Sequence, residues 1–313
     1  MSKIEKALAK ARATSTNSRA IVPTTPKKSV SDVRRELSPT QPAETTRITV
    51  SDVESHARAS ETIARMGEQR IRGRGELSEN RIIFPEMSGN DTVQAFREIR
   101  TKILQRTKGK NGVIMVTSVL GDGGSTFVAL NLGAAIAFDT GKTSLLIDCN
   151  IRKPWFHKLL KDTSQPGLMD YLENTDIDIA EIIHPVGIER MRVIPAGGRR
   201  DVPAEYFTSP KFKFMFESLR RRYSERFVIL DAPPMTDSAD TKILAELCDF
   251  VLLVIPYGRA TKSQIDESIK SIDKNKLLGA VFNNDARLPD LNWKMFVSRI
   301  KTKIYAFFGR KTK

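Results

Sequence analysis

Short runs of apolar residues recur along the chain from about Asn111 onward, and helix-length segments separate most of them. The runs are continuous rather than alternating, which is typical of strands that are buried on both faces of a parallel sheet. The predicted strands are Val113–Thr117, Ser144–Asp148, Arg192–Pro195, Phe227–Asp231, Phe250–Pro256 and Leu278–Asn283. The pattern therefore predicts an α/β fold in which helices cover both faces of a parallel sheet.

The segments before this region have a different pattern. Residues 1–14 place Ile4, Leu8 and Ala11 on one stripe, which predicts a short amphipathic helix. Residues 15–80 contain few large apolar residues and no sustained period, so we expect a disordered linker. Ordered structure is expected to begin at the apolar run Arg81–Pro85, and the α/β domain is predicted to occupy residues 81–286.

Residues 287–313 form a basic tail with an apolar stripe. Its large apolar residues recur at helical spacing, at Trp293, Phe296, Val297, Ile300, Ile304, Phe307 and Phe308. Eight basic residues accompany a single acid in this tail, which predicts a basic amphipathic helix. Such a helix suits the surface of an anionic membrane, and residues 292–313 are the predicted contact. The alternative is that the stripe packs on protein.

The net charge of +14 raises the question of a polyanionic partner. Much of the excess lies in residues 1–80 and 287–313, outside the predicted domain. Few aromatic residues interleave with the basic residues of 1–80, and no helix-turn-helix is apparent, so nucleic acid is not an expected partner. The polar N-terminus does not resemble a signal peptide, and no apolar stretch approaches the ~20 residues of a spanning helix. These features predict a cytoplasmic location.

A glycine-rich loop joins the first predicted strand to an apolar segment with helical length. Its candidate nucleotide-binding residues are Gly121, Asp122, Gly123, Gly124, Ser125 and Thr126. Glycines let backbone N–H groups converge on phosphate, and the N-terminus of the following helix adds its dipole. Ser125 is the hydroxyl predicted to ligate Mg²⁺, and Gly124 replaces the lysine that precedes this hydroxyl in a P-loop. An ordinary strand-to-helix turn is the alternative.

Two of the later strands end in an aspartate, at Asp148 and Asp231. Carboxylates at strand ends beside a phosphate loop hold Mg²⁺ directly or through water. The predicted metal ligands are therefore Ser125, Asp148 and Asp231. The alternative is that each aspartate caps the loop or helix that follows it.

The segments GDGGST, LLIDCNIRKP and FVILDAPP resemble the Walker A, second acidic and Walker B motifs of the bacterial tyrosine kinases of exopolysaccharide export. The resemblance covers roughly residues 90–285. The bacterial tyrosine kinases are in turn related to the deviant-Walker partition ATPases. It implies ATP or ADP with Mg²⁺ as ligands and Asn283 as the adenine contact. It also implies a homo-oligomer formed through the helix that carries Arg97 and Arg100. The implied partner is a membrane polysaccharide co-polymerase, with the chain peripheral at the inner membrane.

Three departures from that family point to impaired catalysis. Gly124 stands in the place of the lysine, Asn150 replaces a second acid, and the C-terminal tyrosine cluster is missing. The predicted function is thus a regulatory, kinase-like component of exopolysaccharide synthesis and export. We expect a lysine at position 124 to raise nucleotide affinity without restoring autophosphorylation. The alternative is an active tyrosine autokinase or ATPase with an unorthodox P-loop.

Overall fold

The computed structural model describes residues 71–87, 91–198, 200, 203–222, 225–236, 239–283 and 304–305. The predicted N-terminal helix at 1–14 lies outside these residues, as does most of the tail. Two tail residues, Ile304–Tyr305, form strand β8 antiparallel to β7, so at this point the structure has strand where we expected helix. Isoleucine and tyrosine both favour strands, and β7 offers them an edge for pairing.

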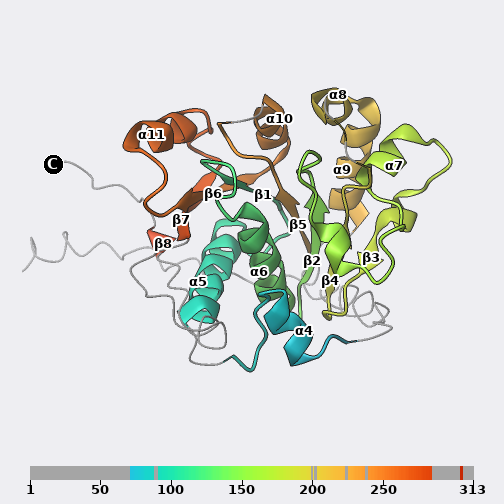
Figure 1. The fold of residues 1–313 in the computed structure, drawn as a ribbon, viewed down its shortest axis with the longest axis horizontal. Coiled ribbons are helices and arrows are strands. Elements are labelled where there is room, and N and C mark those ends of the chain that lie inside the picture. The colour runs from blue at the N-terminus through green and yellow to red at the C-terminus, as the bar shows by residue number, and fades with distance from the viewer. Residues whose placement is uncertain are drawn as a thin grey trace, which may run out of the picture. The chain divides into compact units, whose positions relative to one another are not determined.

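The sheet has the strand order β3-β4-β2-β5-β1-β6-β7-β8 (Figure 1). Its strands are β1 Val113–Ser118, β2 Thr143–Asp148, β3 His184–Pro185, β4 Met191–Ile194, β5 Arg226–Asp231, β6 Phe250–Pro256 and β7 Leu277–Asn283, followed by β8. The six predicted strands are confirmed and are parallel to one another. β3 and β8 pair antiparallel at the two edges.

Helices cover both faces of the sheet, as the continuous apolar runs predict. One face packs under α4 Arg74–Glu79, α5 Asp91–Arg106, α6 Ser125–Ala137 and the 3₁₀ turn η1 Phe156–Leu159. The other packs under α7 Leu168–Glu173, η2 Ile179–Ile182, α8 Pro203–Thr208, α9 Pro210–Arg222, α10 Ala239–Leu247 and α11 Lys262–Lys270. Neighbouring strand residues alternate between the two cores. Ile114 and Val116 belong to the first core, whereas Val113 and Met115 belong to the second.

Helix α6 is apolar around most of its circumference because it is enclosed. It packs against the strands and against α5, and the two helices run side by side in front of the sheet (Figure 1). The ring of Phe127 at its start packs edge-on against Phe96 of α5, with ring centroids 6.0 Å apart. This burial fixes the direction of the helix N-terminus, which carries the glycine-rich loop.

Ordered structure begins earlier than the sequence indicates. Helix α4 lies within the predicted linker 15–80, and its Leu77 is buried in the first core. The Arg72 guanidinium donates to the backbone carbonyls of Leu159 and Val186, which fastens this segment to η1 and to the loop before β4. Ordered structure therefore begins before Arg81, where we expected it to start. The sequence did not indicate this helix, because one buried leucine and the backbone contacts of an arginine produce no periodic pattern.

Candidate phosphate-binding site

The glycine-rich loop lies at the carboxyl end of β1, where Gly124 turns the chain into α6. Gly124 has a φ of 89° in the left-handed region, which glycine adopts without strain. Arg259 donates to the carbonyl oxygens of Gly121 and Asp122 at 3.2 and 3.1 Å. The backbone of the loop is thus held by Arg259, a residue that no sequence motif identified.

Asn283 lies against this loop and does not line the adjacent cavity. Its side chain is 5% exposed, and its Nδ2 donates to the carbonyl of Gly123 at 3.1 Å. A Cβ atom added at Gly124 would lie 1.9 Å from that same Nδ2. The expected adenine contact is therefore engaged in holding the loop. Asn283 as the adenine contact stays a prediction. At position 124 the left-handed backbone and the Asn283 amide both oppose a lysine side chain.

The hydroxyl groups at the start of α6 face the aspartate at the end of β5. Thr126 Oγ1 donates to Asp231 Oδ2 at 2.5 Å, and the neighbouring Ser125 hydroxyl helps to lower the pKa of the same carboxyl. The other oxygen, Asp231 Oδ1, is buried without a hydrogen-bond partner. An acceptor left without a donor beside two hydroxyl groups fits a hard cation such as Mg²⁺. The hydroxyl that donates to Asp231 is that of Thr126, one residue after Ser125, which the sequence predicted as the Mg²⁺ ligand.

Asp148 organises the loop that follows β2. It is fully buried, and it accepts backbone N–H groups from Trp155 at 2.7 Å, Phe156 at 3.0 Å and Asn150 at 3.2 Å. These bonds correspond to the capping role that the sequence left open for this residue. Asp148 is also the register partner of Asp231 on the neighbouring strand, so the two carboxyl groups lie at adjacent strand ends.

Burial and mutual repulsion change the protonation of this aspartate pair. Burial raises the pKa of Asp148 to about 6, although its three backbone N–H donors oppose the change. Burial and the Asp148 carboxylate raise the pKa of Asp231 to about 8, against the effect of the Thr126 and Ser125 hydroxyl groups. A proton is therefore retained at the pair near neutral pH, and a divalent cation would displace it.

The raised pKa values predict that the folded protein loses stability as the pH rises. Between pH 4 and pH 8 the folded state binds more protons at Asp148 and Asp231 than the unfolded chain does, so the free energy of unfolding falls. Urea denaturation of Asp231→Asn at pH 5 and pH 8 should show a smaller fall than the wild type. The exposed Asp162 serves as the control, since Asp162→Asn should keep the wild-type fall. Equal falls in all three proteins would contradict the assigned protonation.

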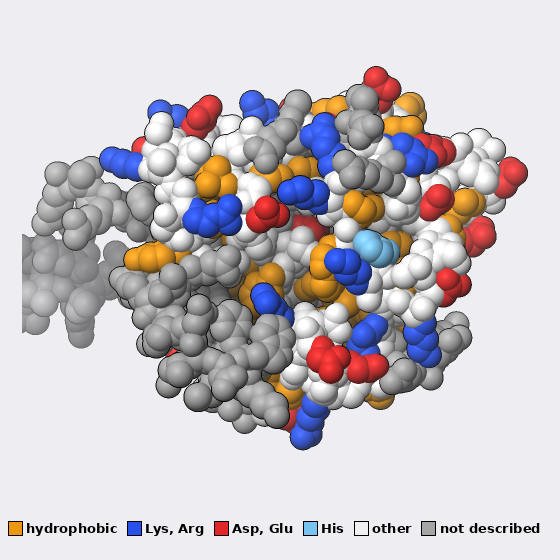
Figure 2. Space-filling model, in the orientation of Figure 1, with side chains coloured by type: hydrophobic (Ala, Val, Ile, Leu, Met, Phe, Trp, Pro, Cys, Tyr) orange, Lys and Arg blue, Asp and Glu red, His pale blue; other side chains and the backbone are white. Residues whose placement is uncertain are grey.

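A cavity of about 650 Å³ opens beside the loop. Figure 2 shows Lys and Arg side chains gathered around a hollow in the middle of this face. Its lining includes all six loop residues predicted to bind nucleotide, four basic side chains and two aromatic ones, namely Gly121, Asp122, Gly123, Gly124, Ser125, Thr126, Arg81, Arg152, Lys153, Lys158, Phe127 and Trp155. The volume falls within the range that holds small ligands. The positive lining favours an anionic one.

The predicted oligomer helix is α5, and one of its two arginines is used within the chain. Arg100 donates to the backbone carbonyl of Ala135 near the end of α6 at 3.1 Å. Arg97 is partly exposed, and Glu98 beside it is exposed. An oligomer formed through this helix stays a prediction. Among the helices in the described part of the chain, none is long and apolar enough to cross a membrane.

No protein-family model matches the chain. It is 32% identical over 202 residues to the tyrosine-protein kinase wzc of Salmonella typhi, covering 63% of this chain and 28% of that protein. It is 29% identical over 201 residues to the succinoglycan biosynthesis transport protein ExoP of Rhizobium meliloti, covering 61% of this chain and 24% of that protein. The BceF tyrosine kinase domain superposes with a TM-score of 0.55 at 25% identity, over 75% of this chain and 89% of that one.

A mostly parallel sheet with a glycine-rich loop between β1 and an enclosed helix, and a carboxylate at the end of β5, is similar to the folds of P-loop NTPases. Within that class, the α/β domain is a homologue of the bacterial tyrosine kinases. The chain spans less than a third of the length of the two curated relatives.

Proposed function

We propose that this protein is a kinase-like regulator of exopolysaccharide synthesis and export whose phosphate site binds nucleotide but transfers phosphoryl groups poorly. The observation that carries the proposal is the contact between Thr126 and Asp231. In a P-loop, lysine directly precedes the Mg²⁺-binding hydroxyl. With Thr126 as that hydroxyl, Ser125 stands in the place of the lysine, and Gly124 is the glycine before it. The P-loop lysine is therefore still missing, as the sequence indicated, but its position is Ser125 and not Gly124.

The residues present suit ATP or ADP with Mg²⁺. Thr126 and Asp231 would hold the cation, with Asp148 beside them, and backbone N–H groups of the loop would contact the phosphates. When bound, Mg²⁺ would neutralise charge on the phosphate oxygens. A serine hydroxyl at position 125 carries no positive charge with which to stabilise charge at the transferred phosphate, a contribution often worth several kcal/mol.

The role in polysaccharide export is supported by what the relatives are named for. One is a succinoglycan biosynthesis transport protein and another is a tyrosine-protein kinase. We propose a membrane polysaccharide co-polymerase as the partner, a peripheral location at the inner membrane, and contact of residues 292–313 with anionic lipid. Vesicle co-sedimentation of the chain with and without 292–313 tests the lipid contact.

Deletion of the gene tests the proposed role in cells. We expect the deletion to change the amount or the chain length of the exported polysaccharide, and the wild-type gene to restore it. The Asp231→Asn variant should restore it less well if nucleotide binding regulates the partner, while Asp162→Asn should match the wild type. Unchanged polysaccharide in the deletion strain would remove the basis for the role.

The second candidate is an active tyrosine autokinase or ATPase with an unorthodox loop. The observation that favours it is the group of basic side chains on the cavity wall, which offers cations to a bound phosphate despite Ser125. Phosphotyrosine on the purified wild-type protein would establish this alternative.

A further inference from the structure

The loop between β2 and η1 carries Lys153 to the phosphate site in a defined position. Asp148 binds both ends of this loop through the N–H groups of Asn150, Trp155 and Phe156. Within the loop, the Lys153 N–H donates to the carbonyl of Asn150 at 3.0 Å. Pro154 further restricts the backbone of the lysine before it. The base of the Lys153 side chain is therefore fixed, and only the side chain itself can move.

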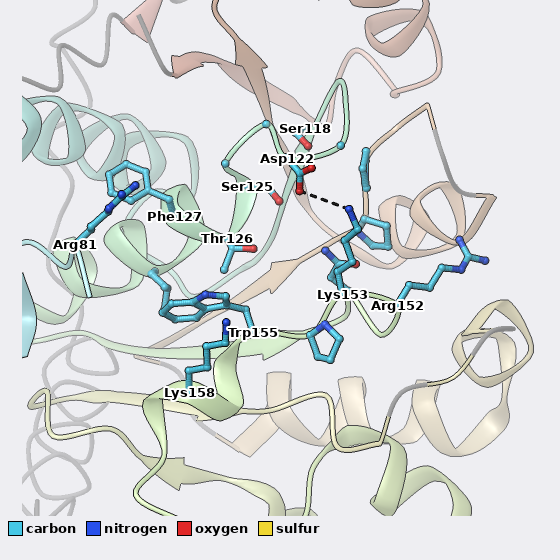
Figure 3. Close-up of a pocket in the computed structure, with 18 of the residues that line it drawn as sticks. Arg81, Ser118, Asp122, Ser125, Thr126, Phe127, Arg152, Lys153, Trp155 and Lys158 are labelled. Atoms are coloured by element: carbon cyan, nitrogen blue, oxygen red, sulfur yellow. Dashed lines mark ion pairs between the residues drawn. The ribbon is translucent and has the colours of Figure 1, made fainter. Parts of the chain in front are cut away.

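The Lys153 side chain points at the glycine-rich loop. Its Nζ lies 3.6 Å from Asp122 Oδ1, and both residues of this ion pair line the cavity (Figure 3). The two side chains are 71% and 76% exposed. An exposed pair of this kind contributes about 0–1 kcal/mol, so its exchange for another partner costs little.

The two other cations of this loop and turn have different partners. Arg152 points away from the glycine-rich loop (Figure 3), and its guanidinium pairs with the buried Asp240 at 3.3 Å. Lys158 lies over the Trp155 ring, with its Nζ 5.9 Å from the ring centroid. Lys153 is thus the cation of this segment whose partner belongs to the phosphate loop itself.

We propose that Lys153 supplies the positive charge that Ser125 lacks, and that Asp122 holds this lysine away from phosphate until a nucleotide enters. The terminal phosphate of a nucleoside diphosphate or triphosphate carries more charge than one carboxylate and accepts several ammonium hydrogen bonds. It therefore displaces Asp122 from Lys153. Asp122 lowers the nucleotide affinity by occupying the lysine. This inference rests on the proposed nucleotide binding.

Titration calorimetry of the full chain with Mg²⁺ and ADP tests the inference. Lys153→Met should weaken binding about tenfold or more, because it removes a charge-assisted hydrogen bond. Lys158→Met removes the same charge from the same cavity and should weaken binding less than about threefold, the size expected of general electrostatics. Lys161→Met lies outside the cavity lining and should leave the affinity unchanged. Thermal unfolding of each variant confirms that it is folded.

The pairing with Asp122 is tested by a double-mutant cycle. Asp122→Asn alone should tighten binding at least about threefold, since it frees Lys153. In the Lys153→Met background the same change should give little gain. Equal weakening by Lys153→Met and Lys158→Met, or a gain from Asp122→Asn that persists without Lys153, would overturn the inference while leaving nucleotide binding intact. If neither the wild type nor Asp122→Asn binds Mg²⁺ and ADP, the inference and the proposed nucleotide binding both fall.

Discussion

Ser125→Lys is expected to raise the affinity for Mg²⁺ and ADP roughly 10- to 100-fold. Position 125 is the first residue of α6, lines the cavity and precedes the hydroxyl that contacts Asp231. A lysine there would add a charge-assisted hydrogen bond to phosphate, worth about 1.5–3 kcal/mol. Ser125→Met has a similar length without the charge and should give no gain. Titration calorimetry of the three proteins measures the difference.

Gly124→Lys provides the contrast that fixes the register of the loop. Its Cβ would lie 1.9 Å from the Asn283 amide, and the backbone would keep a left-handed φ. We expect a loss of stability of about 1–3 kcal/mol and no gain in affinity. If Gly124→Lys tightened binding more than Ser125→Lys, position 124 would be the lysine position, and the assignment of Thr126 would be wrong.

Asp148→Ala is expected to lower the free energy of unfolding by about 3–5 kcal/mol. The change leaves three backbone N–H groups without their acceptor, each costing about 1–3 kcal/mol when it stays buried. Asp148→Asn keeps one acceptor oxygen and should lose less. Urea denaturation at pH 7 measures both. A side chain that served only as a metal ligand would behave differently, because its removal would leave the metal-free stability unchanged or higher.

The strands of the sheet could be predicted because each one is marked by a continuous apolar run in its own short segment of sequence. A strand buried on both faces is apolar at most positions, and this pattern located β1, β2, β4, β5, β6 and β7 to within one residue at each end. The glycine-rich loop and the aspartates at the ends of β2 and β5 could be predicted for a related reason. In parallel sheets the residues that directly follow the strands meet at one edge.

The use of individual side chains could not be predicted in the same way. Whether Ser125 or Thr126 faces Asp231 depends on where α6 begins, and both residues carry the hydroxyl that the motif requires. Asn283 and Arg259 reach the loop from β7 and from the turn after β6, more than 130 residues along the chain. Contacts between residues so far apart in the chain produce no recognisable motif in a single sequence. The helix α4 was missed because one buried leucine gives no period.

The phosphate site is expected to bind nucleotide without transferring its phosphoryl group efficiently. The most direct test measures both properties in one preparation of the wild-type chain, by calorimetric titration with Mg²⁺ and ATP and by release of ADP and formation of phosphotyrosine over hours. We expect binding that weakens when Mg²⁺ is removed, with ADP release and phosphotyrosine no higher than in Asp231→Asn. Phosphotyrosine or ADP formed by the wild type at a rate that Asp231→Asn abolishes would show instead that the site transfers phosphoryl groups.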